Sequence, residues 1–283
     1  MTKISVIGTG TMGSGIAQSA LSSGFEVTMV AHSDKSAAEA KAKVEKGFSK
    51  AVMANAISQK DVPQLLQHLK VSSSIQDISG SEIVIEAVSE NFDVKKEVLS
   101  AAEKYAGGCI IATNTSSIPI SKLAEALNSK DRFVGIHFFN PVPVMKVVEL
   151  VKGEHTSEET LSKARSFVEK LGKAPIDVLD FPGFIANRLL MLFINEAANL
   201  LDKGIATKEG IDTIVKLGLH HPMGPFELAD FIGLDVCNDI MLEIYNRTYE
   251  RNFKPAESIS KLVKEGALGR KSGKGFYNYQ NSN

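Results

Sequence analysis

The first half of the chain alternates short apolar runs with longer stretches in which apolar residues recur at helical spacing. The apolar runs lie at Ile4–Ile7, Val27–Val30, Ile83–Val88, Ile110–Thr113 and Val134–Phe139. Nearly continuous apolar strands alternating with helices are typical of a parallel sheet that is covered on both faces. We therefore predict an α/β fold for this half.

Two further features shape the predicted first domain. Residues 34–68 are rich in Ala and Lys and restart near Asn55, so we expect two consecutive helices, which would project beyond the sheet as a helical-pair insertion. We also expect strands at Met145–Val151 and Pro175–Leu179, with a helix from about Glu158 to Gly172 between them.

A strong break follows at Asp180-Phe181-Pro182-Gly183, because Pro and Gly interrupt regular structure. Beyond it the pattern becomes mostly helical. The first predicted helix there has a buried stripe of Ile185, Leu189, Leu192, Phe193, Ala197 and Leu200 at helical spacing. We predict two domains, an α/β domain over residues 1–183 and an all-α domain over residues 184–283.

Composition limits the classes of partner. The formal net charge of the 283 residues is −1, so no overall field attracts nucleic acid or an anionic membrane. No apolar run approaches the roughly 18–20 residues of a membrane span. The two cysteines, Cys109 and Cys237, are far apart, so we expect reduced structural thiols and no metal site. These features favour a cytoplasmic location.

A glycine-rich turn directly follows the first predicted strand. Gly8-Thr9-Gly10-Thr11-Met12-Gly13 fits G-x-G-x-x-G and opens a predicted helix. In a Rossmann-type fold the first glycine permits the turn, the second lets a pyrophosphate approach, and the third allows close packing of helix and strand. The sequence therefore predicts a dinucleotide-binding site that includes Gly8, Gly10, Thr11, Met12 and Gly13.

The end of the second predicted strand bears on which dinucleotide is bound. An acidic residue usually stands there and binds the ribose 2′-hydroxyl, but Ala31 occupies this position. His32, Ser33 and Lys35 follow and offer donors to a 2′-phosphate. We therefore expect a preference for NADP(H). No Arg is present here, and NAD(H) remains the alternative.

A histidine inside an apolar strand is the candidate proton carrier. His137 lies within Phe133–Asn140, and Glu149 lies within the next apolar strand. Antiparallel pairing of these strands, joined through Pro141-Val142-Pro143, would bring the two side chains together. A carboxylate beside imidazole orients the ring, and histidine titrates near neutral pH. A structural buried His–Glu pair is the alternative.

The predicted strand that ends at Thr113 is followed by Asn114-Thr115-Ser116-Ser117. These small polar residues lie at the carboxyl edge of the sheet, where ligands bind in open α/β folds. A purely local role, turning the chain and capping the next helix, is the alternative.

Six motifs in order carry a resemblance to a known family. They are the glycine turn, Asn114–Ser117, His137-Phe138-Phe139-Asn140-Pro141, Pro182–Arg188, His221-Pro222-Met223-Gly224-Pro225 and Leu268–Tyr277. Together they resemble the 3-hydroxyacyl-CoA dehydrogenases of the bacterial 3-hydroxybutyryl-CoA type, over essentially the whole chain.

The resemblance implies roles at the matching positions. His137 would be the catalytic acid/base with Glu149 as its partner, Ser116 would bind the substrate 3-oxygen, and Asn187 would lie near the thioester carbonyl. Positions implied to touch the dinucleotide or coenzyme A are Glu90, Lys95, Asn114, Asn140 and Lys271 for the dinucleotide and Lys50 for the phosphates of coenzyme A. The family fold is a Rossmann domain followed by a helical domain that dimerises.

The expected reaction is reversible hydride transfer between NAD(P)(H) and acetoacetyl-CoA or (S)-3-hydroxybutyryl-CoA. Two alternatives remain open. One is a hydroxy-acid or gulonate-type dehydrogenase on the same fold, and the other is a dinucleotide-binding sensor or crystallin without turnover. Lys50 favours the CoA substrate over the first, and the set of Ser116, His137, Glu149 and Asn187 argues against the second.

Overall fold

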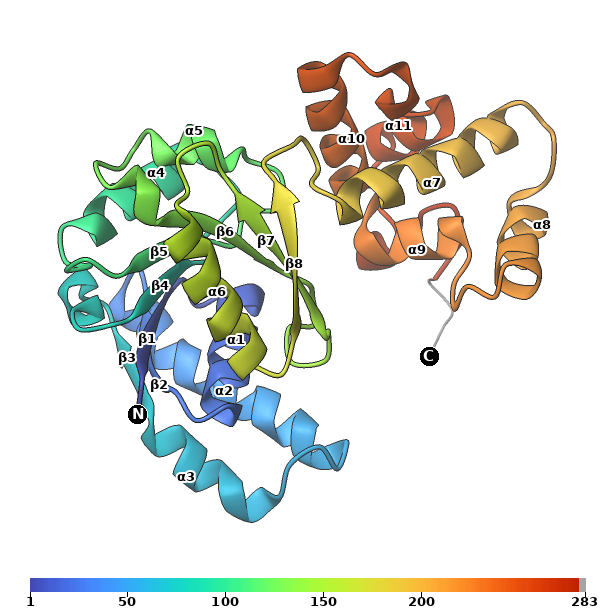
Figure 1. Ribbon diagram of the computed structural model, residues 1–283. Helices are drawn as coiled ribbons and strands as arrows, with labels where there is room; N and C mark the ends of the chain where they lie inside the picture. The colour runs from blue at the N-terminus through green and yellow to red at the C-terminus, as the bar shows by residue number, and fades with distance from the viewer. Residues whose placement is uncertain (280–283) are drawn as a thin grey trace. The chain divides into compact units, whose positions relative to one another are not determined.

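The computed structural model describes residues 1–279 and divides into two compact units (Figure 1). The first unit comprises Met1–Phe181, and the second begins at Pro182. The division falls at the Pro-Gly break in the sequence, beyond which strands give way to helices.

An eight-stranded sheet forms the centre of the first unit, in the order β3-β2-β1-β4-β5-β6-β7-β8. The strands are β1 Lys3–Ile7, β2 Glu26–Val30, β3 Leu69–Ser72, β4 Ile83–Glu86, β5 Ile110–Thr113, β6 Phe133–Phe138, β7 Val147–Lys152 and β8 Ala174–Leu179. Every neighbouring pair is parallel except β6 and β7, which are antiparallel. The predicted α/β fold of Rossmann type is confirmed.

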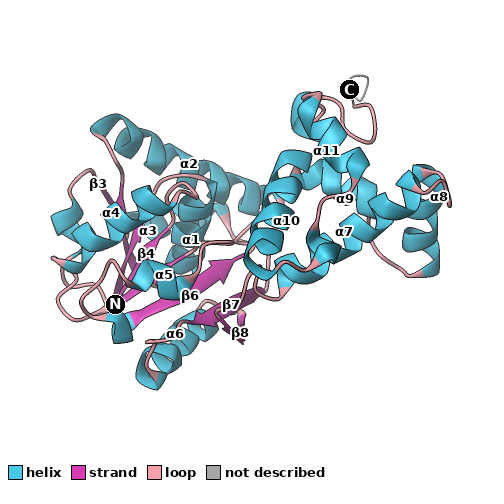
Figure 2. Cartoon of the chain, turned by 90° about the horizontal axis from the view of Figure 1, so that it is seen from above, coloured by secondary structure: helices cyan, strands magenta, loops and turns pink. Residues whose placement is uncertain are grey.

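Helices cover both faces of this sheet, as Figure 2 shows from above. They are α1 Thr11–Ser22, α2 Asp34–Met53, α3 Val62–Gln67, α4 Phe92–Glu103, α5 Ile120–Ala124 and α6 Glu158–Lys170. Helices α1 and α6 pack on one face, where their apolar residues join one cluster with the sheet. Helix α4 packs on the other face, against a smaller apolar cluster.

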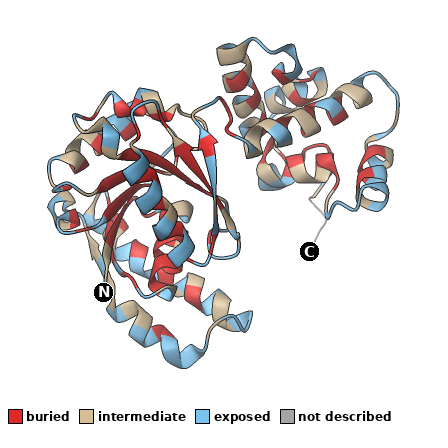
Figure 3. Cartoon of the chain, viewed as in Figure 1, coloured by how far each residue is buried: buried red, intermediate tan, exposed pale blue. Residues whose placement is uncertain are grey.

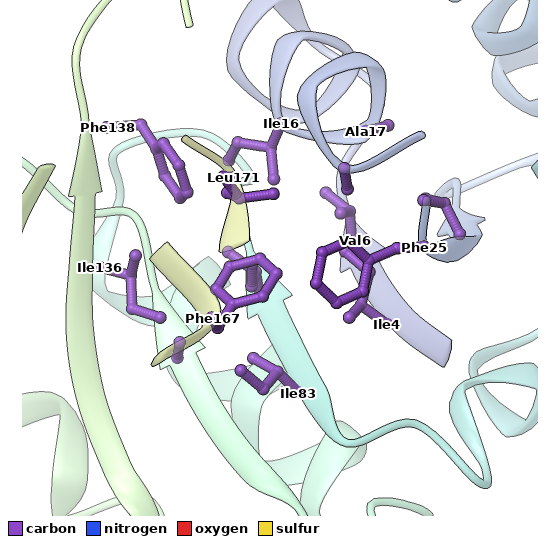
Figure 4. Close-up of a cluster of buried hydrophobic side chains, with 14 of the residues drawn as sticks. Ile4, Val6, Ile16, Ala17, Phe25, Ile83, Ile136, Phe138, Phe167 and Leu171 are labelled. Carbon is purple, nitrogen blue, oxygen red and sulfur yellow. The ribbon is translucent and has the colours of Figure 1, made fainter. Parts of the chain in front are cut away.

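The core follows the two-residue period of the strands. In β1, Ile4 and Val6 point into the larger cluster, whereas Ile7 belongs to the smaller cluster on the opposite face. Figure 4 shows Phe25 and Phe167 in the same cluster as Ile4 and Val6, and the rings of Phe25 and Phe167 meet edge to face with centroids 5.4 Å apart. Burying a Phe side chain stabilises the fold by about 1.5–3 kcal/mol. The contact between Phe25 and Phe167 therefore holds α6 against the face of the sheet to which Ile4 and Val6 point.

The predicted pair of helices after β2 is confirmed as α2 and α3. Helix α2 packs on α1, and its residues Ala40, Val44 and Phe48 are buried at helical spacing. Figure 3 shows that buried residues are concentrated in the strands of the sheet. The last residue of α2, Met53, is 84% exposed. Sequence patterning missed β3, because this four-residue edge strand contains Lys70 and Ser72 and has no buried residue.

The second unit is helical, as predicted. Its helices are α7 Ala186–Asp202, α8 Lys208–Thr213, α9 Pro225–Ile232, α10 Leu234–Thr248 and α11 Glu257–Lys264. A separate apolar cluster fills its centre and includes Met191, Phe226, Met241 and Phe253.

Two buried aspartates explain why two of the motifs in this unit have glycine at particular positions. Asp212 accepts hydrogen bonds from the backbone N–H of Phe226 at 2.9 Å, in the first turn of α9. A Cβ on Gly224 would lie 2.2 Å from the carboxyl carbon of Asp212. Asp230 accepts from the N–H of Phe276 at 2.9 Å, and a Cβ on Gly275 would lie 2.0 Å from the Asp230 carboxylate. The glycines let the backbone reach the buried carboxylates.

Both cysteines are free thiols. Burial raises the pKa of Cys109 to about 11 and that of Cys237 to about 12, so both carry a proton at neutral pH. Over residues 1–279, none of the helices has the length and apolar character that crossing a membrane requires.

Candidate active site

The glycine turn between β1 and α1 has the geometry that a dinucleotide requires. Gly8 has a φ of +117°, and a Cβ there would lie 2.4 Å from the carbonyl oxygen of Ala87. A Cβ on Gly13 would lie 2.1 Å from the carbonyl oxygen of Gly8. Gly10 differs, since the position of its missing Cβ has no described atom within 4 Å. Two glycines serve the packing of the turn, and the third borders open space.

The start of α1 is suited to an anion. Among the described residues, no side chain caps this helix at Gly10, and its first turn contains no acidic residue. The first N–H groups of a helix have no partners within the helix and lie at the positive end of its dipole. These residues therefore fit the pyrophosphate of a dinucleotide.

The segment after β2 is ordered by its own hydrogen bonds. Ala31 is buried, and its N–H donates to the carbonyl oxygen of Ser72 at 2.8 Å. Ser33 is the N-cap of α2 and accepts from the N–H of Ser36 at 3.3 Å, while Nδ1 of His32 lies 2.9 Å from the Ser36 hydroxyl. Two of the residues predicted to bind a 2′-phosphate, His32 and Ser33, thus form a hydrogen-bonded cluster with Ser36 beside Ala31.

His137 and Glu149 are brought together as predicted. They are directly paired residues in the antiparallel register of β6 and β7. Nδ1 of His137 lies 2.7 Å from a carboxylate oxygen of Glu149, and both side chains are buried. The side-chain oxygen of Asn114 accepts from the N–H of Phe138 at 3.0 Å. The loop after β5 is therefore tied to the strand that carries His137.

The connection from β6 to β7 is held at both ends. Lys173 is buried and donates to the carbonyl oxygens of Val142 and Met145 at 2.6 and 2.7 Å. A Cβ on Gly15 of α1 would lie 3.0 Å from the Cβ of Val142. The first turns of α1 therefore pack closely against the connection that follows His137.

Glu90 organises the predicted substrate-binding loop. Its Oε1 oxygen accepts from the Thr115 hydroxyl at 2.6 Å, from the N–H of Ser116 at 2.8 Å and from the N–H of Ser117 at 3.1 Å. The Ser116 hydroxyl donates to the same oxygen at 3.3 Å. Burial opposes ionisation of Glu90, but the Lys95 charge and these hydrogen bonds outweigh it and lower its pKa.

Lys95 is buried between two carboxylates. Its Nζ lies 2.7 Å from Glu86 and 3.2 Å from Glu90, and its side chain is 1% exposed. Sequence reasoning missed Glu86, which ends β4 and is fully buried. The signal was available, because Glu86 interrupts an apolar run just as Glu149 does. Lys43 was also missed; its Nζ donates to the carbonyl oxygen of Thr9 at 3.2 Å.

The remaining predicted residues are distributed over both units. Asn140 is exposed after β6, and Lys50 is exposed in the last turn of α2. In the second unit, Asn187 lies in the first turn of α7. There Lys271 donates to the carboxylate of Asp235 at 2.6 Å. The roles predicted for these four residues, like those of the other site residues, stay predictions.

Comparison with known proteins identifies the family. Residues 3–181 match the model of the 3-hydroxyacyl-CoA dehydrogenase NAD binding domain. Residues 183–279 match the model of the 3-hydroxyacyl-CoA dehydrogenase C-terminal domain. The chain belongs to the 3-hydroxyacyl-CoA dehydrogenase family. It is accordingly an oxidoreductase whose first unit carries the NAD-binding domain of this family, which confirms the predicted resemblance.

Individual relatives span nearly the whole chain. The probable 3-hydroxybutyryl-CoA dehydrogenase of Bacillus subtilis is 40% identical over 98% of this chain and 97% of its own. The mitochondrial hydroxyacyl-coenzyme A dehydrogenase of Sus scrofa is 41% identical over 98% of this chain and 91% of its own. The crystal structure of (S)-3-hydroxybutyryl-CoA dehydrogenase from Ralstonia eutropha is similar with a TM-score of 0.96 and 41% identity, covering 99% of this chain and 100% of that one.

The glycine turn yields a prediction that separates binding from folding. In Gly10→Ala the added methyl group enters open space, so the free energy of unfolding should stay within about 0.5 kcal/mol of wild type. The same methyl group should obstruct the pyrophosphate and raise the Kd for the reduced dinucleotide about tenfold or more. Urea unfolding and titration of dinucleotide fluorescence measure the two quantities.

Gly13→Ala is the matched comparison, because its methyl group meets the Gly8 carbonyl oxygen and not open space. It should lower the free energy of unfolding by about 1–3 kcal/mol or more, through overpacking. Unchanged dinucleotide affinity in Gly10→Ala, or wild-type stability in Gly13→Ala, would contradict the division of roles within the turn.

Proposed function

We propose that this protein catalyses reversible hydride transfer between a nicotinamide dinucleotide and acetoacetyl-CoA or (S)-3-hydroxybutyryl-CoA. The observation that carries the proposal is the buried hydrogen bond between His137 and Glu149, at 2.7 Å, on the strand tied to the Asn114 loop. The names of the Bacillus subtilis and Ralstonia eutropha relatives support a short 3-hydroxyacyl-CoA as substrate.

The proton is the part of the reaction that the chain's own residues handle. When bound, the dinucleotide supplies or accepts the hydride at C3 of the substrate. In the reducing direction, protonated His137 donates a proton to the C3 oxygen as negative charge develops there. Because Nδ1 faces Glu149, the proton that is transferred is the one on Nε2. The Glu149 carboxylate keeps the ring in this orientation.

Other residues orient the substrate. Ser116 donates a hydrogen bond to the C3 oxygen, which stabilises the charge that develops there more than the charge of the ground state. Asn187 binds near the thioester carbonyl. Lys50, exposed on α2, contacts the phosphates of coenzyme A. Its neighbours Ala51, Val52 and Met53 add no charge to this contact.

For the dinucleotide, we propose a preference for NADP(H) over NAD(H). Ala31 places no carboxylate at the end of β2, so a 2′-phosphate meets no repulsion there. His32 and Ser33 stand beside it with exposed Lys35, and all three can donate to phosphate oxygens. Besides the glycine turn, Glu90, Asn114, Asn140 and Lys271 contact the remainder of the dinucleotide. Lys95, which the resemblance also assigned to it, is 1% exposed and is bound by Glu86 and Glu90, so it acts on the dinucleotide through Glu90.

We further propose that two copies associate through the second unit. This unit exposes several large apolar side chains, which a monomer would leave in water. They include Leu189, Ile205, Ile214, Leu217, Leu219 and Phe231, which are 58–74% exposed. Burying such side chains against a second copy provides the driving force for a homodimer.

The first test removes the proton carrier. His137→Gln keeps a polar side chain but cannot transfer a proton, so kcat for acetoacetyl-CoA reduction should fall by about 10²–10⁴. The exposed His155 provides the control, since His155→Gln should retain wild-type kcat. Retention of more than about a tenth of the activity in His137→Gln would contradict the role.

The same assay tests the substrate class. Turnover of free acetoacetate in place of its CoA thioester would favour the alternative function, a hydroxy-acid dehydrogenase.

The second test concerns the dinucleotide. Ala31→Asp adds the missing carboxylate, so the ratio of kcat/KM for NADPH to that for NADH should fall about tenfold or more, because the carboxylate repels a 2′-phosphate. Ala38→Asp adds the same charge at an exposed position on α2 and should leave the ratio near that of wild type. A wild-type preference for NADH of about tenfold or more would refute the proposed preference.

The third test concerns association. Leu217 is 74% exposed, and Leu217→Arg places a charge where a second copy is proposed to pack. Light scattering should report about twice the 30.5 kDa chain mass for wild type and a shift toward the monomer for Leu217→Arg. Met53→Arg, at an 84% exposed site of the first unit, should keep the wild-type mass. A monomeric wild type would rule out the dimer.

A further inference from the structure

A buried group of charges next to the Ser116 loop has no part in the proton transfer described above. Glu86 ends β4 with none of its surface exposed. One of its carboxylate oxygens accepts from the N–H of Val88 and from Nζ of Lys95, both at 2.7 Å. The other accepts from the Thr113 hydroxyl, also at 2.7 Å. Glu86 therefore joins the ends of β4 and β5 to the first turn of α4.

Lys95 extends these contacts toward the loop. It is bound by Glu86 at 2.7 Å and by the Oε2 oxygen of Glu90 at 3.2 Å. The Oε1 oxygen of Glu90 is the one that accepts from the N–H groups of Ser116 and Ser117. One carboxylate oxygen of Glu90 thus faces the buried lysine, and the other faces the loop.

The burial of this group calls for an explanation other than stability. Removing the Glu86 carboxylate and the Lys95 ammonium from water is costly, and apolar residues of similar volume often stabilise a fold as well or better. Within the described residues, Glu86 is the more deeply buried partner of Lys95, with 0% of its side chain exposed against 37% for Glu90. Without Glu86, Lys95 would be bound only by the more exposed Glu90, and it would move with that side chain.

We propose that Glu86 is a positioning residue for Ser116, acting through Lys95 and Glu90. Glu86 fixes the Lys95 ammonium, the ammonium fixes one oxygen of Glu90, and the other oxygen holds the backbone of the Ser116 loop. The hydroxyl of Ser116 makes the longer contact with Glu90, at 3.3 Å, compared with 2.8 Å for its N–H. The backbone is thereby fixed while the hydroxyl can turn toward a substrate oxygen. This inference rests on the proposed role of Ser116.

The test is a double-mutant cycle between Glu86→Gln and Ser116→Ala. The amide of Gln keeps the shape of Glu86 but loses its charge, so kcat/KM for acetoacetyl-CoA should fall about tenfold or more. Because Glu86 acts through Ser116, the double variant should lose little more than Ser116→Ala alone. The Kd for acetoacetyl-CoA, measured by calorimetry without dinucleotide, should show the same non-additivity.

Glu103→Gln is the matched control. Glu103 also holds a loop, accepting from the N–H groups of Asn128 and Ser129 at 3.0 and 2.8 Å, but this loop follows α5, whereas the Ser116 loop precedes it. Its variant should keep wild-type kcat/KM and Kd. If Glu86→Gln does not fold, Thr113→Val replaces it in the cycle, since it removes one hydrogen bond of Glu86 and leaves every charge in place.

The outcomes separate the two proposals. Losses that multiply in the double variant show a general structural effect and overturn the positioning role, as does wild-type behaviour of Glu86→Gln when Ser116→Ala is impaired. Full activity of Ser116→Ala would instead refute the proposed role of Ser116, and the positioning role with it. Absence of acetoacetyl-CoA reduction by the wild-type protein would refute the proposed function itself.

Discussion

The reversal of chain direction between β6 and β7 is the constraint on which the site depends. Six parallel strands precede it, and only the antiparallel pairing places His137 opposite Glu149 in register. A shift of one residue would turn every side chain of β7 to the other face of the sheet, and the hydrogen bond would be lost. The register is secured by burial, since Val148 and Leu150, on either side of Glu149, belong to the apolar core.

The same connection links the proton carrier to the dinucleotide site. Lys173 binds two carbonyl oxygens of the turn, and Val142 of that turn packs against Gly15 in α1. A larger residue at position 15 would separate α1 from the turn. The spacing between the glycine turn and His137 is therefore a property of close packing in the first unit, and it needs no ligand to be established.

The sequence was sufficient for features that arise from periodicity and local chemistry. Strand runs such as Ile4–Ile7, the paired helices of residues 34–68 and the antiparallel partners His137 and Glu149 were all predictable. Strand β3 was not, because a short edge strand needs few apolar residues and its side chains remain partly in water. Its pairing with β2 is a tertiary contact that no local pattern encodes.

Side-chain networks were the other feature that sequence reasoning could not supply. The carboxylate of Glu90 was assigned to the dinucleotide by resemblance, yet in the structure it also gathers the N–H groups of the Ser116 loop. Which acceptor a loop finds depends on the distance between β4 and β5, a property of the folded sheet. Gly275, in the Leu268–Tyr277 motif, illustrates the same limit. Its partner Asp230 lies 45 residues earlier in the chain.

Buried charge is concentrated where precise placement matters. Glu86, Lys95 and Glu149 lie at or beside the carboxyl edge of the sheet, whereas the buried residues of β1, β2 and β5 include no charged side chain. Burying charges costs stability unless each is paired and hydrogen-bonded, and here each has a partner within 2.7 Å. A low-dielectric surrounding strengthens every such contact and removes the need for reorganisation when charge develops on a substrate. These buried charges therefore cost stability, but the same charges hold the reacting groups in the positions that catalysis requires.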